Sequence, residues 1–347
     1  MSKRIERRPF LLEIGSEEIP ARFIPDARRE VAARLTSLLG ELDLDHAPLR
    51  VLATPRRLAV LCPQLAVEQP DREEVVKGPP VSVAFDAEGQ PTRAGEGFAR
   101  KLGVALSSCE RGRDDRGEHL LVRRHVPGRA AADVLGERLP ALVLGLPFRK
   151  TMRWGALDIE YARPLQWLLC LLGDAVVPFA VGELTSGRTT RGHRTLSGDA
   201  RRDLPDATTY EAALAELGVM PDPEDRRRAI LERAEPLLAG EAEPSRLRAD
   251  EDLLQEVVDL CEHPTAFVGA YDTAFFELPD EVIVTALKAH QRYFTVESPA
   301  GGLRPRFVAV RDGGEEHLDE VRAGNERVLR ARLADALFYW RFDQQRS

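Results

Sequence analysis

The stretch that most constrains the fold lies between Phe148 and Arg194. An apolar run from Leu165 to Leu172 ends at the turn pair Gly173-Asp174, and a second apolar run, Val176 to Val181, follows it. Apolar runs of this length on either side of a Gly-Asp turn are typical of buried strands. The stretch therefore predicts a β-hairpin at the core of a domain.

Basic side chains flank this hairpin at both ends. The stretch opens with Arg149, Lys150 and Arg153 beside Trp154, and it closes with the segment SGRTTRGHR at residues 186–194. Arginine side chains do not join an apolar core unpaired, so they must face water or an anion. We therefore expect a cationic loop at each end of the hairpin.

The rest of the chain mixes strands and helices without an obvious parallel βαβ winding. The first 200 residues alternate between the two, a mostly helical part follows, and a small unit with a long final helix closes the chain. This pattern predicts an α+β fold with mixed or antiparallel sheets and flanking helices. The predicted regions are 1–200 with the basic loops, 201–264 as a helical segment, and 265–347 as a small α+β unit.

Composition narrows the class of protein. The formal net charge of −8 argues only weakly against nucleic-acid binding, because affinity for phosphate depends on a local patch. No apolar run approaches the roughly 20 residues that a membrane span needs. The basic N-terminus lacks an apolar signal core, so we expect a cytoplasmic protein that does not enter a membrane. The four cysteines are far apart, so neither a zinc site nor disulfides are expected.

Several catalytic motifs are missing from the sequence. It contains no Walker loop, G-x-G-x-x-G, G-x-S-x-G or H-E-x-x-H pattern, and its seven histidines are scattered. Glu17 and Glu18 are a possible acid–base pair, but a solvated helix entry is the better interpretation. We therefore predict no catalytic residue, no metal site and no cofactor on this chain.

Basic clusters with aromatic neighbours remain. The planar guanidinium group suits phosphate, and aromatic rings give unpaired bases a stacking surface. The candidate RNA-contacting residues are Arg56, Arg57, Arg149, Lys150, Arg153, Arg188, Arg191, His193, Arg194 and Arg292. The segment 186–194 is the strongest candidate, since so many cations are hard to satisfy internally, and it contacts either RNA or a partner subunit. The turn Thr54-Pro55-Arg56-Arg57 either presents its two guanidinium groups or pairs with acids, and the run Arg226-Arg227-Arg228 is interpreted as a solvated helix face.

Long motifs in the sequence resemble a known family. They are LLEIGSEEIP at 11–20, ATPRRLAVL at 53–61, KGPP at 77–80, GFARKLGV at 97–104, KTMRWG at 150–155, the RPLQWLLCLLGD run, SGRTTRGHR, KAHQRYF at 288–294 and GNERVLRARLADALFYW at 324–340. Together, and in this order, they are similar to the beta subunit of the bacterial two-subunit glycyl-tRNA synthetase.

This resemblance implies a non-catalytic subunit of glycine–tRNA ligase. In the family, a separate alpha subunit activates glycine with ATP and Mg²⁺, and the beta subunit handles tRNA(Gly) within an expected alpha2beta2 assembly. The N-terminal region is similar to the B3/B4 module of the phenylalanyl-tRNA synthetase beta chain. Family chains continue past the equivalent of LADALFYW into HD-like and anticodon-binding regions, so anticodon recognition is expected to be absent here.

Two alternatives stay open at this point. In the first, the chain is an editing-like hydrolase that acts on mischarged tRNA. In the second, it is an inactive truncated remnant. The hydrolase would need a positioned water and a general base, and no histidine, cysteine or paired carboxylate clearly supplies one.

Overall fold

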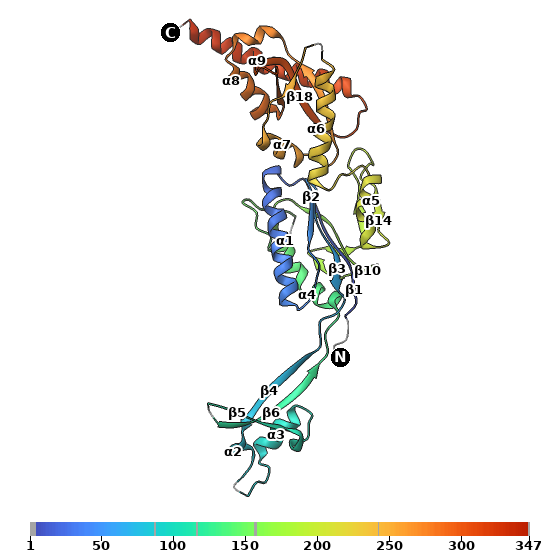
Figure 1. Cartoon of the computed structure of the whole chain (residues 1–347), viewed down its shortest axis with the longest axis vertical. Coiled ribbons are helices and arrows are strands. Elements are labelled where there is room, and N and C mark those ends of the chain that lie inside the picture. Colours follow the sequence, from blue (N-terminus) through green and yellow to red (C-terminus); the bar gives the residue numbers. More distant parts are fainter. Residues whose placement is uncertain (1–4, 87, 116, 156–157, 242, 346–347) are drawn as a thin grey trace.

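The computed structural model describes residues 5–86, 88–115, 117–155, 158–241 and 243–345. The molecule is elongated and consists of three parts in a row (Figure 1). We call them the arm (residues 72–126), the central domain (residues 5–71 and 127–219) and the C-terminal domain (residues 220–345). The central domain lies between the other two.

The central domain contains a sheet in the order β11-β12-β9-β1-β3-β2, with β10 beside β9. β1 (Arg7–Ser16) is antiparallel to β3 (Arg57–Ala66) on one side and to β9 (Leu165–Leu172) on the other. The other strands are β2 (Arg50–Thr54), β10 (Ala175–Val176), β11 (Ala180–Val181) and β12 (Leu184–Gly187). Only the β12–β9 pair of this sheet is parallel among the described residues, and the mixed pairing confirms the predicted α+β class.

The predicted hairpin forms at β9, but its second strand is broken. Gly173 makes the turn with a φ of 63°, and β10 then pairs antiparallel with β9. The N–H of Val177 still donates to the carbonyl of Cys170 (3.0 Å), and the chain leaves the ladder at Pro178, because proline has no N–H group to donate to a neighbouring strand. The predicted continuous strand from Val176 to Val181 is therefore wrong in its middle.

Helices cover both faces of the central sheet. α1 (Ile24–Glu41) and α4 (Ala131–Leu144) pack on one face, where Leu35 is completely buried. α5 (Tyr210–Glu216) packs on the opposite face after the short β14 (Arg201–Asp203) and η3 (Ala207–Thr209). A strand covered on both faces needs apolar side chains in both of its alternating directions, which explains the unbroken apolar sequence of β9.

The arm projects from the central domain on its two longest strands (Figure 1). Its sheet has the order β4-β6-β5, formed by β4 (Arg72–Pro80), β6 (Gly117–Val126) and β5 (Glu110–Asp114). Three short helices, α2 (Val81–Ala84), α3 (Arg93–Lys101) and η2 (Leu106–Ser108), close its tip. Gly78 in β4 lies against the Phe98 ring of α3, so a Cβ at this position would come within 2.6 Å of the ring.

The C-terminal domain has a second antiparallel sheet in the order β15-β17-β18-β16. Its strands are β15 (Arg246–Leu247), β16 (Pro264–Ala270), β17 (Phe294–Glu297) and β18 (Leu303–Asp312). α6 (Pro223–Ala239) and α7 (Glu251–Val258) cover one face, and η4 (Thr273–Glu277), α8 (Asp280–Thr285), the π-helical turn η5 (Ala286–Gln291) and α9 (Leu318–Gln344) cover the other.

The helices of residues 201–264 divide between the two sheets. α5 belongs to the core of the central domain, whereas α6 and α7 belong to the core of the C-terminal domain. The predicted boundaries at 200 and 264 stay a prediction. Within the described part of the chain, no helix combines the length and the apolar character that crossing a membrane requires.

The packing of α1 predicts a large effect of Leu35→Ala. Leu35 is fully buried between α1 and the sheet, so the substitution should lower the free energy of unfolding by about 2–5 kcal/mol in urea denaturation. Leu144→Ala on α4, where the side chain is 40% exposed, is the control and should change it by about 0.5 kcal/mol or less. Equal effects would contradict the assigned core.

Candidate functional site

The turn between β2 and β3, Thr54-Pro55-Arg56-Arg57, is tied to the end of β1. The backbone N–H of Ser16 donates to the carbonyl of Arg56 (2.9 Å), and that of Ile19 donates to the carbonyl of Pro55 (2.7 Å). Both arginine side chains lie inside the protein, and the exposed fraction is 4% for Arg56 and 0% for Arg57. The turn therefore does not present two guanidinium groups to solvent, and the alternative of pairing with acids is what the structure shows.

Arg57 joins two acids from different domains. Its Nη1 donates to Glu13 of β1 at 3.1 Å, and its Nε donates to Glu262, just before β16, at 3.0 Å. Burial by itself would lower the pKa of Arg57, but Glu262 and Glu13 outweigh it and raise that pKa. All three side chains are almost or fully inaccessible, so this ion triad is part of the core between the central and C-terminal domains.

Neutral donors reach one oxygen of each carboxylate, whereas Oε2 of Glu13 and Nη2 of Arg57 are buried without a hydrogen-bond partner among the described residues. Glu13 also accepts hydrogen bonds from the hydroxyl groups of Thr190 (3.1 Å) and Tyr210 (3.0 Å), and Glu262 accepts one from Thr54 (2.6 Å). Buried charges are tolerated when hydrogen bonds satisfy their remaining lone pairs. The network therefore spans strands β1, β2, β3 and β13 (Thr189–Arg191), helix α5 and the loop before β16.

Arg56 and Trp167 extend this network, and we call the whole contact between the central and C-terminal domains the junction. Arg56 donates to the carbonyl of Gly192 at 3.1 Å and to Asp199 at 2.6 Å. The Trp167 ring lies 5.7 Å from the Arg56 guanidinium, 5.5 Å from that of Arg57 and 5.0 Å from that of Arg191. A Cβ added to Gly15 would come within 2.0 Å of the indole, so only glycine leaves room for Trp167 here.

His193 is a second link between the two domains. Its Nδ1 faces the backbone N–H groups of Thr195 and Leu196, each at 3.2 Å, so its Nε2–H is the group that donates to Asp312 (3.1 Å). The same Asp312 oxygen accepts the N–H groups of Glu262 and His263, both at 2.8 Å. Burial would raise the pKa of Asp312, but these hydrogen bonds outweigh it and lower that pKa.

The other cations of segment 186–194 also have internal partners. Arg188 donates to the carbonyls of Leu204 and Asp174, and Arg191 donates to the carbonyl of Gln166 and pairs with Asp199 at 3.5 Å. Arg194 pairs with Glu17 and Glu18, at 2.8 and 3.3 Å, which also accounts for that acidic pair. The expectation that these cations are hard to satisfy internally is therefore wrong, because backbone carbonyls and acids distant in sequence surround them.

The run Arg226-Arg227-Arg228 is not a uniformly solvated helix face. Arg226 is completely buried and donates to the carbonyls of Val258 (3.0 Å), Met220 (2.6 Å) and Ala53 (2.7 Å). Burial lowers the pKa of this guanidinium. Arg226 thus joins α6 and α7 to the end of β2, whereas Arg227 and Arg228 pair with acids nearer the surface.

Four candidates lie on the surface away from the junction. Arg149 is 80% exposed and reaches Asp26 of α1 at 3.8 Å, and Lys150 beside it is exposed. Arg153, in the two-residue strand β7 (Met152–Arg153), pairs with Glu160 of β8 (Glu160–Tyr161) at 2.9 Å. Arg292 adopts a left-handed φ of 57° at the end of η5 and pairs with Glu256 at 3.1 Å. The structure therefore brings Arg56, Arg57, Arg191 and His193 together inside the molecule, with Arg194 at its edge, and leaves the other exposed cations dispersed.

The acids that organise the junction were missed in the sequence. Glu13 interrupts the apolar run of β1, and Glu262 follows the buried Cys261. A charged residue inside an otherwise apolar strand is a signal for buried pairing, because such a charge is not left without a partner. The sequence contains that signal, but nothing in it shows that Glu13 and Glu262 share Arg57.

Metal-ligating and nucleophilic side chains are the remaining candidates for chemistry among the residues that the structure describes. Within that part of the chain, no group of three His, Cys, Asp or Glu side chains is placed to hold a metal ion. Burial raises the pKa of the Cys170 and Cys261 thiols, which disfavours a thiolate nucleophile at either position.

Comparison with known proteins gives one consistent result. The family model described as glycyl-tRNA synthetase beta subunit matches residues 10–347. A glycine–tRNA ligase beta subunit of Nitratidesulfovibrio vulgaris is 46% identical over 335 residues, which is 96% of this chain and 47% of that protein. The beta subunit of Geobacter metallireducens is 44% identical over 338 residues, 97% of this chain and 48% of that protein. The chain spans about half the length of these curated relatives.

The ion triad predicts a large cost for Arg57→Ala. Removing the guanidinium leaves Glu13 and Glu262 charged and buried without their partner, so the free energy of unfolding should fall by about 3–5 kcal/mol in urea denaturation. Arg50→Ala on the neighbouring strand is the matched control. Arg50 is half exposed and also pairs with two acids, so Arg50→Ala should lower the free energy of unfolding by about 1 kcal/mol or less. A small effect at Arg57 would show that the triad does not hold the fold.

The lowered pKa of Asp312 predicts an acid-sensitive contribution to stability. A carboxyl group with a lowered pKa stabilises the fold above its unfolded pKa of about 3.9, and that contribution is lost as the pH falls through the folded value. Between about pH 5 and pH 3, the free energy of unfolding of the wild type should therefore fall more steeply than that of Asp312→Asn. Parallel pH profiles would contradict this linkage.

Proposed function

Because the chain belongs to the family of glycyl-tRNA synthetase beta subunits, we propose that it is a tRNA-handling part of glycine–tRNA ligase. The observation that carries this proposal is the match of the family model to residues 10–347. In this proposal the chain binds tRNA(Gly), the catalytic alpha subunit or both, and glycine activation with ATP and Mg²⁺ takes place on the alpha subunit within an alpha2beta2 assembly. The chain itself contributes no aminoacylation site and acts in the cytoplasm.

The surface loop after α4 is our proposed tRNA contact on the central domain. Arg149 and Lys150 are exposed, and the only acid within ion-pair distance of Arg149 among the described residues is Asp26 at 3.8 Å. The loop is held in place by the Phe148 ring, which packs against Phe23 and Tyr161 with ring centroids 6.4 and 4.8 Å apart. A fixed loop with two exposed cations, of which Arg149 has only a long ion pair to Asp26, suits a phosphate backbone, because little ordering is needed on binding.

Arg153 and Arg194 are the second group of proposed contacts. Both are about half exposed or more, and their acidic partners are also at the surface. Exposed ion pairs are worth only about 0–1 kcal/mol, so a phosphate can replace the acid at small cost. Arg56, Arg57 and His193 are not part of this proposed surface, because their own side chains are buried. Arg188 and Arg191 remain candidate contacts, because each residue is partly exposed and an RNA phosphate can reach it.

The test is a salt titration of tRNA binding by the whole chain, with tRNA(Gly) and an unrelated tRNA. If Arg149 and Lys150 contact phosphates, the double variant R149A/K150A should bind both tRNAs more weakly, and the slope of log K against log salt should become shallower by about one per lost contact. The double variant R129A/R138A is the control, because it removes two half-exposed arginines elsewhere on the central domain.

Each outcome bears on the proposal. Salt-sensitive binding that prefers tRNA(Gly) supports a role of these residues in tRNA recognition. Binding by the wild type with an unchanged slope in R149A/K150A would exclude this loop as the contact. Failure to bind any tRNA at low salt, together with failure to co-purify with the alpha subunit, would overturn the proposed function.

A further inference from the structure

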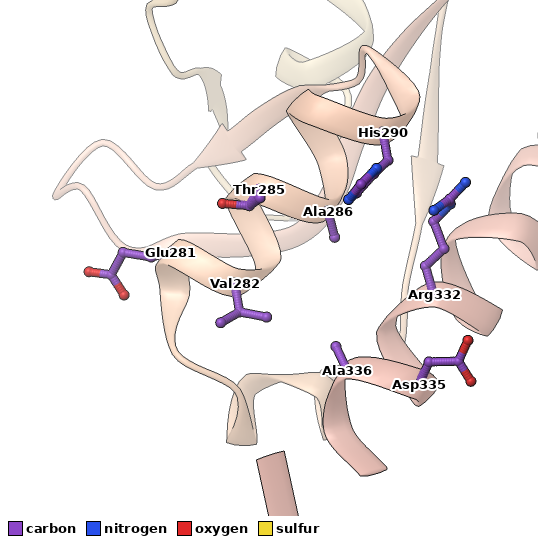
Figure 2. Close-up of a pocket in the computed structure, with 8 residues that line it drawn as sticks. All are labelled: Glu281, Val282, Thr285, Ala286, His290, Arg332, Asp335 and Ala336. Atoms are coloured by element: carbon purple, nitrogen blue, oxygen red, sulfur yellow. The ribbon is translucent and has the colours of Figure 1, made fainter. Parts of the chain in front are cut away.

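A cleft of about 440 Å³ lies on the C-terminal domain between α8–η5 and α9 (Figure 2). Its walls carry the small apolar side chains Val282, Ala286 and Ala336. His290 from η5 and Arg332 from α9 stand at the same end of the gap, and they come from opposite walls (Figure 2). The cleft therefore has an apolar middle and one end lined by an arginine and a histidine.

Neither His290 nor Arg332 has an acidic partner among the residues that the structure describes. Neighbouring cations do: Lys288 pairs with Asp250 at 2.6 Å, and Arg341 pairs with Glu277. Glu281 and Asp335 also border the cleft, but their carboxylates point away from the gap (Figure 2). An arginine and a histidine that face one cleft without an acid are suited to an anion supplied from outside.

The backbone around His290 supports a binding role. η5 is a π-helical turn that ends at Arg292, whose φ of 57° is unusual for a residue other than glycine. The turn is closed by the N–H of Tyr293, which donates to the carbonyl of Leu287 at 3.0 Å. Short π-helical turns and left-handed residues cost stability and concentrate at functional sites. Here the turn brings His290 to face α9.

Aromatic side chains continue along the same helix. Tyr339, one turn beyond Asp335 and Ala336, is 65% exposed, and so is the adjacent Phe338. These rings do not line the cleft, but they lie on the same helix as Arg332. Exposed rings and basic side chains along one surface suit single-stranded nucleic acid, because bases stack on the rings while phosphates meet the positive charges. The volume of the cleft is within the range of small-ligand pockets, which is large enough for one nucleotide.

We propose that this cleft takes one unpaired nucleotide of RNA. Its phosphate lies between His290 and Arg332, and its base lies against Val282, Ala286 and Ala336. The inference rests on the proposed tRNA-handling function and adds to it a site for an unpaired segment, distinct from the loop at Arg149. Docking of a protein segment at the same place is the competing outcome of the test.

The test measures binding of a fluorescein-labelled short single-stranded RNA and of a tRNA(Gly) transcript to the whole chain. R332A and H290A, which change side chains at the cleft surface, should each weaken binding of the single strand by about tenfold, and R332A, which removes a charge, should also make its salt dependence shallower. V282W fills the apolar middle without changing charge, so it should weaken binding by a similar factor and leave the salt slope unchanged. Circular dichroism and thermal melting establish that the variants are folded.

R330A is the matched control. Arg330 is an exposed arginine on the same helix that does not line the cleft and has no ion pair among the described residues. It should change binding by no more than about twofold. Equal effects of R330A and R332A would overturn the site, because only the charge of the helix would then matter.

The remaining outcomes separate the site from the function. If the wild type binds tRNA but R332A, H290A and V282W bind like it, the cleft assignment fails while the proposed function stands. If the wild type binds neither RNA, the inference fails, and the proposed function also fails if the chain does not co-purify with the alpha subunit. If the variants instead lose association with the alpha subunit and keep RNA binding, the cleft is a protein-docking site and the inference is overturned.

Discussion

Arg57 lies between Glu13 of the central sheet and Glu262 of the C-terminal domain, and much of the structure depends on these two ion pairs. A buried ion pair gains little over an apolar contact, but it is highly selective, because separating its members leaves uncompensated charges inside the protein. The relative position of the two domains is therefore set by a charge requirement in addition to apolar packing. His193 with Asp312 and Arg226 with the carbonyl of Ala53 add directional links at the same junction.

Many of the cations that the sequence predicts as RNA contacts instead form part of this junction. Arg56, Arg57 and His193 are inside the protein, and Arg191 lies against Trp167 with its guanidinium on a backbone carbonyl. A dense run of arginines is thus compatible with a structural role whenever the fold supplies carbonyls and acids around it. Cations that point away from the junction, such as Arg149 and Lys150, have few internal partners and are better placed to meet phosphate.

Because the molecule is elongated, the surfaces that are available for binding a partner lie apart from one another. The arm extends from one end of the central domain, and the cleft between η5 and α9 lies on the C-terminal domain at the other end (Figure 1). The loop at Arg149 lies on the central domain beside the start of α1. A long nucleic acid can contact separated surfaces of this kind at once, and simultaneous contacts raise the overall affinity beyond that of each surface.

The sequence by itself determined the fold class and the first strand of the central hairpin, because these depend on apolar periodicity and on glycine at the turn. Leu165–Leu172 is a strand as predicted, and the motifs identified the family correctly. Only the tertiary structure decided which charges are buried. Glu13, Arg57 and Glu262 are separated by 44 and 205 residues along the chain, and local patterns do not show that such residues meet. The burial of a charge depends on the partners that surround it in space. One arginine-rich segment therefore stabilises the fold through Arg57, whereas another, at Arg149, lies on the surface.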